Sequence, residues 1–165
     1  MPRSVSLAPA RMGKASMADA SLPPTFVARF HDEAAVRRMQ YRRLGQTEMI
    51  VSKIAFGSGP IGGMFGNVED SITQIVEVAL RNGINFIDTA YWYGHARSES
   101  ILGKVLSKVP RKAYYICTKI HDADFEPHQS IILYETLQAL QMARHSGKIR
   151  YVGITGYGLR KIATS

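Results

Sequence analysis

The chain has 165 residues, 45% hydrophobic and 21% charged, a balance typical of one soluble globular domain. No apolar run approaches the roughly 18 residues that a membrane-spanning helix needs. A single cysteine, Cys117, excludes an internal disulfide framework and a cysteine-based zinc cluster. The formal net charge of +8 favours polyanions in general without selecting one.

Residues 1–30 differ in composition from the rest. They are rich in Ser, Ala and Pro, contain one acidic residue, Asp19, and lack the apolar region of a secretory signal. We therefore predict a disordered leader over 1–30 and one folded domain over 31–165. The lone cysteine favours a reducing compartment and hence a cytoplasmic location. The basic leader makes mitochondrial targeting the alternative.

The predicted domain begins with residues 31–38, whose pattern indicates one short helix or helical turn. Two strand-like runs follow, at 39–44 and 50–56, with Gly45 in the segment between them. Such a pair of runs around a turn predicts an antiparallel hairpin. A glycine-rich loop occupies 57–66.

Three helices are predicted beyond this loop. The first follows Asn67 and ends at Gly83, a favourable C-cap. The second has Ser98 as its N-cap and ends before Pro110. The third runs from Ser130 to about Ser146 and is closed by the next glycine. Its expected inward-facing residues are Leu133, Leu137 and Leu140.

Strand-like runs alternate with these helices. Their repeated alternation predicts an α/β fold in which a parallel sheet carries helices on its faces. The four runs are 51–57, 84–88, 113–119 and 149–155.

The glycine loop contains Gly57, Gly59 and Gly62 in the spacing G-x-G-x-x-G after a predicted strand. This spacing is that of a dinucleotide-binding Rossmann site. The fit is poor, because a Rossmann helix opens within the motif, whereas helix signals here begin only near Asn67. A glycine turn without a ligand and a loop lining a different cofactor site are the two other interpretations.

A second group of residues carries chemistry. Asp88 and Lys119 end predicted strands, Tyr93 lies in the loop after Asp88, and His121 follows Lys119 closely. An ammonium stabilises a nearby phenolate, a carboxylate holds the ammonium, and an imidazole orients a carbonyl or shares its proton. Each residue alone is also typical of a cap, a packing contact or a solvated strand end. Together they predict proton transfer to or from a carbonyl or alcohol oxygen.

Three segments of the chain resemble a known protein family. The segments at 39–59, 82–106 and 114–119 contain a hairpin, Asp-Thr-Ala-x-x-Tyr-Gly, Ser-Glu-x-x-Leu-Gly and Thr-Lys in the order seen in aldo-keto reductases. The nearest branch is L-galactose dehydrogenase-like, or aldose 1-dehydrogenase-like. The resemblance runs from about residue 31 to 162, with a gap. It implies a (β/α)8 barrel, an active site at the carboxyl ends of the strands, and NADP or NAD bound without a Rossmann fold.

The resemblance also implies roles for individual residues. Asp88, Tyr93 and Lys119 match the catalytic positions, with Tyr93 as proton donor or acceptor, and His121 resembles the histidine that ends the fourth barrel strand. The cofactor-binding positions are Gly57, Gly59, Asp88, Thr155 and Gly156. The implied reaction is hydride transfer between NAD(P) and a sugar, such as the aldose L-galactose, or a small carbonyl or alcohol.

Two departures from the family pattern bear on activity. The family places a helix and a strand between its lysine and its histidine, whereas only Ile120 separates Lys119 from His121. A parallel crossover needs about a dozen residues, so one βα unit is expected to be absent. About four strands are predicted, half of a (β/α)8 TIM barrel. We therefore expect a partial barrel whose open sheet edges favour self-association. The alternative function is a catalytically inactive fragment acting, if at all, as a partner of a full-length relative.

Other classes of site have weaker support in the sequence. The basic residues at 37–43 and 104–112 lack a nucleic-acid recognition motif and are interpreted as solvated faces. No metal-ligand spacing is present, and Cys117 is expected in a strand core. We expect no nucleic-acid, membrane or metal partner.

Overall fold

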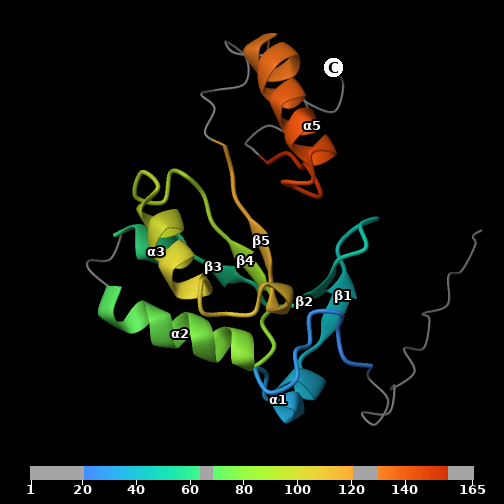
Figure 1. Ribbon diagram of the computed structural model, residues 1–165, viewed down its shortest axis with the longest axis vertical. Coiled ribbons are helices and arrows are strands. Elements are labelled where there is room, and N and C mark those ends of the chain that lie inside the picture. The colour runs from blue at the N-terminus through green and yellow to red at the C-terminus, as the bar shows by residue number, and fades with distance from the viewer. Residues whose placement is uncertain (1–20, 64–68, 121–129, 156–165) are drawn as a thin grey trace, which may run out of the picture.

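The computed structural model describes residues 21–63, 69–120 and 130–155. They form two small sheets with helices (Figure 1). One sheet pairs β1 (Tyr41–Arg43) antiparallel with β2 (Ile50–Ser52). The other has the parallel order β3 (Phe56–Gly57), β4 (Phe86–Asp88) and β5 (Tyr115–Cys117). The predicted parallel α/β arrangement is confirmed for these three strands.

The start of the domain follows the sequence pattern. Helix α1 (Glu33–Arg38) is capped by Asp32, whose carboxylate accepts the Ala35 N–H at 3.0 Å. The predicted hairpin is confirmed by the pairing of Arg42 with Val51. The second run nevertheless divides between two sheets, because β2 ends at Ser52 and β3 begins at Phe56.

Residues 21–30 were expected in the disordered leader, but the structure packs them against the domain. Thr25 is buried, and Val27 and Phe30 pack on the core. The Arg81 guanidinium donates to the Phe30 carbonyl at 2.7 Å and stacks on the Phe30 ring. Burial of these apolar side chains offsets the entropy of ordering the segment. Residues 1–20 of the predicted leader lie outside the described residues.

Asn85 joins this segment, the hairpin and β4. Its side chain is 1% exposed, accepts the Ser52 N–H at 2.7 Å and donates to the Thr25 hydroxyl and the Ile50 carbonyl, both at 2.9 Å. A buried amide with these contacts connects three parts of the chain that are distant in sequence.

The main core lies between the parallel sheet and two helices. Helices α2 (Glu69–Arg81) and α3 (Arg97–Leu106) lie on the same side of the sheet (Figure 1). Their apolar residues pack with Ile87 of β4, which is fully buried. The predicted α2 is confirmed, and Gly83 beyond it adopts a φ of +99°. The largest fully buried apolar side chains are Leu80, Ile87, Leu102, Val36 and Val76.

Ser98 does not cap α3 as predicted. The cap position is Ala96, and Ser98 lies in the first turn with its hydroxyl fully buried. The hydroxyl finds its partners outside the helix, which the local pattern does not show. Two short 3-10 turns, Gly59–Gly62 and Arg111–Ala113, precede α2 and β5 respectively.

The C-terminal part departs further from the predictions. The predicted helix is confirmed from Ser130 onward, with a π turn at Ile132–Thr136 followed by α5 (Leu137–His145), and Gly147 has a φ of +74°. No residue of the π turn or α5 is buried, so the inward face predicted for this helix is wrong, and Leu133 is 38% exposed. Figure 1 shows α5 apart from the sheet and from α2 and α3.

The strand predicted at 149–155 is also wrong, since these residues form no ladder with a described strand. Its β-favouring composition has no effect without a neighbouring strand to accept its hydrogen bonds. Among the described helices, none is long and apolar enough to cross a membrane.

Asn85→Ala should lower the free energy of unfolding by about 3 kcal/mol, because it leaves a buried N–H, hydroxyl and carbonyl without partners. Asn82→Ala is the matched control, since Asn82 is exposed at the end of α2, and should change stability by less than about 0.5 kcal/mol. Urea unfolding of both variants measures the difference. Equal effects would show that Asn85 does not join the three segments.

Candidate active site

The parallel pairing aligns the ends of three strands. Gly57 is the Cα partner of Asp88, and Asp88 is the partner of Cys117. The ladder continues beyond the strands, because the Ser58 N–H donates to the Asp88 carbonyl at 2.9 Å and the Thr89 N–H to the Cys117 carbonyl at 2.8 Å. Residues that follow the strands therefore emerge at one edge of the sheet, as expected for Asp88 and Lys119.

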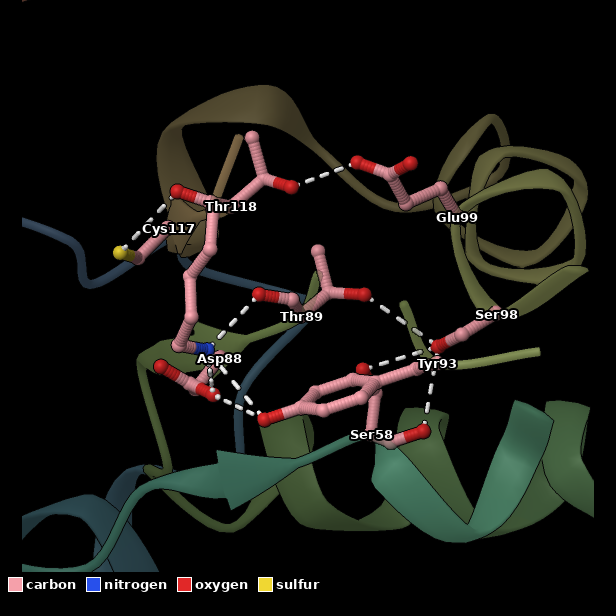
Figure 2. A network of polar contacts seen from close by, with 9 residues as sticks. Ser58, Asp88, Thr89, Tyr93, Ser98, Glu99, Cys117 and Thr118 are labelled. Carbon is pink, nitrogen blue, oxygen red and sulfur yellow. Dashed lines mark hydrogen bonds and ion pairs between the residues drawn. The ribbon is translucent and has the colours of Figure 1, made fainter. Parts of the chain in front are cut away.

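Three acceptors surround the Lys119 ammonium. Its Nζ donates to Asp88 Oδ1 at 2.6 Å, to the Thr89 carbonyl at 2.9 Å and to Tyr93 Oη at 3.3 Å. An ammonium has three N–H donors, so these contacts use all of them. Figure 2 shows Asp88 and Tyr93 directed toward one another in this network.

Asp88, Tyr93 and Lys119 are thus brought together as predicted. Tyr93 Oη donates to Asp88 Oδ1 at 3.4 Å, and the ammonium lies 5.0 Å from the centroid of the Tyr93 ring. The side chains of Lys119 and Asp88 are 31% and 34% exposed, which leaves the group open to a ligand.

The charge of Lys119 is favoured by these neighbours. Burial by itself lowers its pKa, but the hydrogen bonds to Asp88 and Tyr93 and their charges outweigh burial and raise the pKa above its usual 10.5. The side chain therefore stays an ammonium at neutral pH. Burial and the Asp88 charge raise the pKa of the nearby Cys117 thiol, which keeps it protonated and weakly nucleophilic.

Tyr93 is held in a strained turn between β4 and α3. Three consecutive residues, Gly94, His95 and Ala96, have left-handed φ values of +74°, +51° and +68°. This region is unfavourable for residues other than glycine. Backbone bonds support the turn: the Ala96 N–H donates to the Tyr91 carbonyl at 2.6 Å, and the Ser98 N–H to the Tyr93 carbonyl at 3.1 Å.

The glycine loop packs directly on this turn. A Cβ on Gly62 would lie 2.4 Å from the Tyr93 carbonyl carbon, and one on Gly94 would lie 2.2 Å from the Gly62 oxygen. Only two glycines allow these backbones to approach so closely. By contrast, a Cβ on Gly57 or Gly59 would meet nothing within 4 Å, so space remains above those positions.

Sequence reasoning missed a group of buried hydroxyls beneath the site. Ser98 Oγ donates to Ser58 Oγ at 2.9 Å and lies 3.2 Å from Thr89 Oγ1, and all three residues are at most 1% exposed (Figure 2). They connect the end of β3, the end of β4 and the first turn of α3. The sequence signal for this group is a small hydroxyl residue directly after the end of β3 and after the end of β4.

A second missed contact lies at the rim. Thr118 Oγ1 donates to Glu99 Oε1 at 2.6 Å (Figure 2). It joins α3 to the residue that precedes Lys119, and so links the helix after the Tyr93 turn to the chain that carries the ammonium.

The remaining predicted site residues are His121, Thr155 and Gly156. His121 and Gly156 lie outside the described residues. Thr155 is described and exposed, but it does not end a strand, so the geometry expected for it is absent. Within the described ranges, no cluster of His, Cys, Asp or Glu suits a metal ion.

Comparison with known proteins decides the family. Residues 53–132 match the Aldo/keto reductase family, and this range contains Asp88, Tyr93 and Lys119. L-galactose dehydrogenase of Arabidopsis thaliana is 34% identical over 160 residues, covering 74% of this chain and 50% of the relative. The chain belongs to the aldo-keto reductase family.

A second relative and a solved structure are also similar to this chain. Versiconal hemiacetal acetate reductase of Aspergillus parasiticus is 39% identical over 90 residues, covering 50% of this chain and 26% of that protein. The holo form of an aldo-keto reductase from Bacillus halodurans superposes with a TM-score of 0.62 at 23% identity, covering 76% of this chain and 53% of the other, and so shares the fold.

This aldo-keto reductase chain spans half the length of L-galactose dehydrogenase. The alignment has 160 positions but includes only 74% of the 165 residues of this chain. Some residues of the relative within the aligned region therefore have no counterpart in this chain. This agrees with the expected gap in the resemblance.

Gly62→Ala should destabilise this aldo-keto reductase chain by about 1–3 kcal/mol and displace the Tyr93 turn, because the new methyl group overlaps backbone atoms. Gly59→Ala, in the same 3-10 turn but with open space around it, should be neutral or slightly stabilising. The single tryptophan, Trp92, lies in the turn, so its emission reports the displacement. An unchanged emission in Gly62→Ala would contradict the close packing.

The raised pKa of Lys119 predicts a pH dependence of stability. Its interactions stabilise the fold fully below pH 10.5 and are lost as the pH rises through the higher pKa of the folded chain. The stability difference between the wild type and Lys119→Met should therefore shrink above pH 10.5 in urea titrations. Burial raises the pKa of Tyr41 to about 12. Tyr41 titrates in both proteins, so its effect on stability cancels in the difference. A constant difference would contradict the prediction.

Proposed function

We propose that this chain carries the catalytic end of an NAD(P)-dependent oxidoreductase that interconverts an alcohol and a carbonyl of a sugar or small molecule. The observation that supports this proposal is the Lys119 ammonium, which contacts both Asp88 and Tyr93 through hydrogen bonds of 2.6 and 3.3 Å. In this proposal, β3, β4 and β5 are the first strands of a (β/α)8 barrel, with the site at their carboxyl ends.

Tyr93 is the residue that moves the proton. In reduction, its phenol donates the proton to the carbonyl oxygen, and in oxidation its phenolate accepts the proton of the alcohol. The ammonium of Lys119 stabilises the negative charge that forms on the phenol oxygen. Asp88 holds that ammonium in place and balances its charge.

The residues present suit the nicotinamide end of the cofactor. Gly57 and Gly59 leave open space beside Asp88, where a side chain would stand in the way of a flat ring. The nicotinamide, when bound, supplies or accepts the hydride. NADP and NAD share this end, so the choice between them rests on contacts elsewhere.

The proposed substrate is an aldose. L-galactose dehydrogenase, at 34% identity, and D-arabinose 1-dehydrogenase of Saccharomyces cerevisiae, at 27% identity, both bear names of sugar dehydrogenases. In this proposal the alcohol that loses its proton to Tyr93 is the anomeric hydroxyl of the sugar.

A second candidate function is an inactive chain that associates with a second copy. Strands β3 and β5 each have one edge without a strand partner among the described residues. Ile116 at the β5 edge is 43% exposed, and on the last helix Met142 is 72% exposed. Unpaired edges and exposed apolar side chains both favour association, and a second copy offers the same edges.

Tyr93→Phe tests the catalytic proposal. It should lower kcat for aldose oxidation about a hundredfold or more, because the proton acceptor is lost, while NADPH and NADH binding followed by fluorescence stays unchanged. Tyr134→Phe is the matched control, because Tyr134 is 70% exposed on the π turn and should leave kcat unchanged.

Light scattering on the same samples separates the two candidates. Saturable cofactor binding with Tyr93-dependent turnover supports the enzyme. A discrete dimer that binds neither NADPH nor NADH supports the second candidate. Turnover retained in Tyr93→Phe would overturn the role assigned to this residue.

A further inference from the structure

A cleft with basic residues lies at the opposite end of β5 from the candidate active site. It has a volume of about 200 Å³, and Arg111, Lys112 and Arg150 line it together with Tyr114 and Tyr115. Tyr115 begins β5, whereas Lys119 follows its last residue. At about 3.3 Å per residue the two positions are about 13 Å apart, so the cleft is separate from the catalytic group.

Aromatic rings orient the two guanidinium groups of the cleft. The Arg111 guanidinium lies 4.8 Å from the centroid of the Tyr114 ring, and the Arg150 guanidinium lies 5.1 Å from that of Tyr115. Both tyrosines are buried, at 7% and 8% exposure. The rings therefore position the two guanidinium groups by stacking, without neutralising their positive charge.

The charge of the cleft is not balanced by acidic residues. None of the residues that line it is acidic, and within the described chain no carboxylate forms an ion pair with Arg111, Lys112 or Arg150. One N–H of Arg111 donates to the Tyr114 carbonyl at 2.8 Å, and its other N–H groups bond to no other residue that the structure describes. Three adjacent cations with low-dielectric walls produce a strong local positive potential.

We propose that this cleft binds the phosphate group of a small phosphorylated molecule. A tetrahedral oxyanion presents several acceptor oxygens, and guanidinium groups bind such oxygens through paired charge-assisted hydrogen bonds. Pro24 and Thr25 complete the lining of the cleft, and its volume of about 200 Å³ suits a compact group. The site requires no catalytic step and is independent of the proposed oxidoreductase activity.

Isothermal titration of the full chain with inorganic phosphate, at constant ionic strength set with chloride, tests this proposal. The wild type should show saturable binding. Arg150→Gln should weaken it about tenfold, the effect of losing one charge-assisted hydrogen bond. Arg144→Gln is the matched control, since Arg144 is exposed in the last turn of α5, lies outside the cleft and loses the same charge. Binding in this control should be unchanged.

A second ligand identifies the source of the phosphate, and a second variant guards against misfolding of the first. Glycerol 3-phosphate binding more tightly than phosphate indicates an ester ligand, and the reverse order indicates the free ion. Lys112→Gln provides a second variant, because Lys112 is exposed and has no structural contact of the kind that Arg111 makes. Absence of saturable binding in the wild type, or equal weakening in Arg144→Gln, would overturn the proposal.

Discussion

The parallel register of β3, β4 and β5 is the constraint on which the candidate site depends. It places Gly57, Asp88 and Cys117 in one row, so that the chain after each strand leaves the sheet at the same edge. The Lys119 ammonium then reaches a carboxylate from the neighbouring strand and a carbonyl just beyond it. A shift of one residue in the pairing of β4 with β5 would turn Asp88 to the opposite face relative to Lys119 and separate the ion pair.

The position of Tyr93 depends on backbone packing more than on its own side-chain contacts. Left-handed conformations at His95 and Ala96 cost on the order of 1–2 kcal/mol each. The turn retains them because Gly62 packs against its outer side and the buried Ser98 fixes the start of the helix that follows. The Tyr93 phenol is therefore presented to the ammonium by a turn that has little room to relax, which is the preorganisation that the proposed proton transfer requires.

Local signals predicted a large part of this arrangement. The short helix α1, the hairpin and α2 each follow from residues within one or two turns, and the meeting of Asp88 with Lys119 follows from parallel strands. The buried role of Ser98 was not predictable in this way, because its partners, Ser58 and Thr89, belong to two other elements. The packing of residues 21–30 likewise depends on Asn85 and Arg81, which lie more than 50 positions further along the chain.

The segment at 149–155 shows why a strand pattern alone does not make a strand. Arg150 stacks on Tyr115, and the Tyr151 hydroxyl accepts the Glu48 N–H at 3.2 Å, so the segment begins at the amino end of β5. A strand starting there and running parallel to β5 would reach the level of Lys119 after about four residues. Thr155 would then lie near the edge of the sheet that carries the candidate site, where the family resemblance places it. If Thr155 binds the cofactor as the family resemblance implies, this segment must first pair with the open edge of β5. Hydrogen bonds between the two strands, rather than the motif itself, would supply that contact.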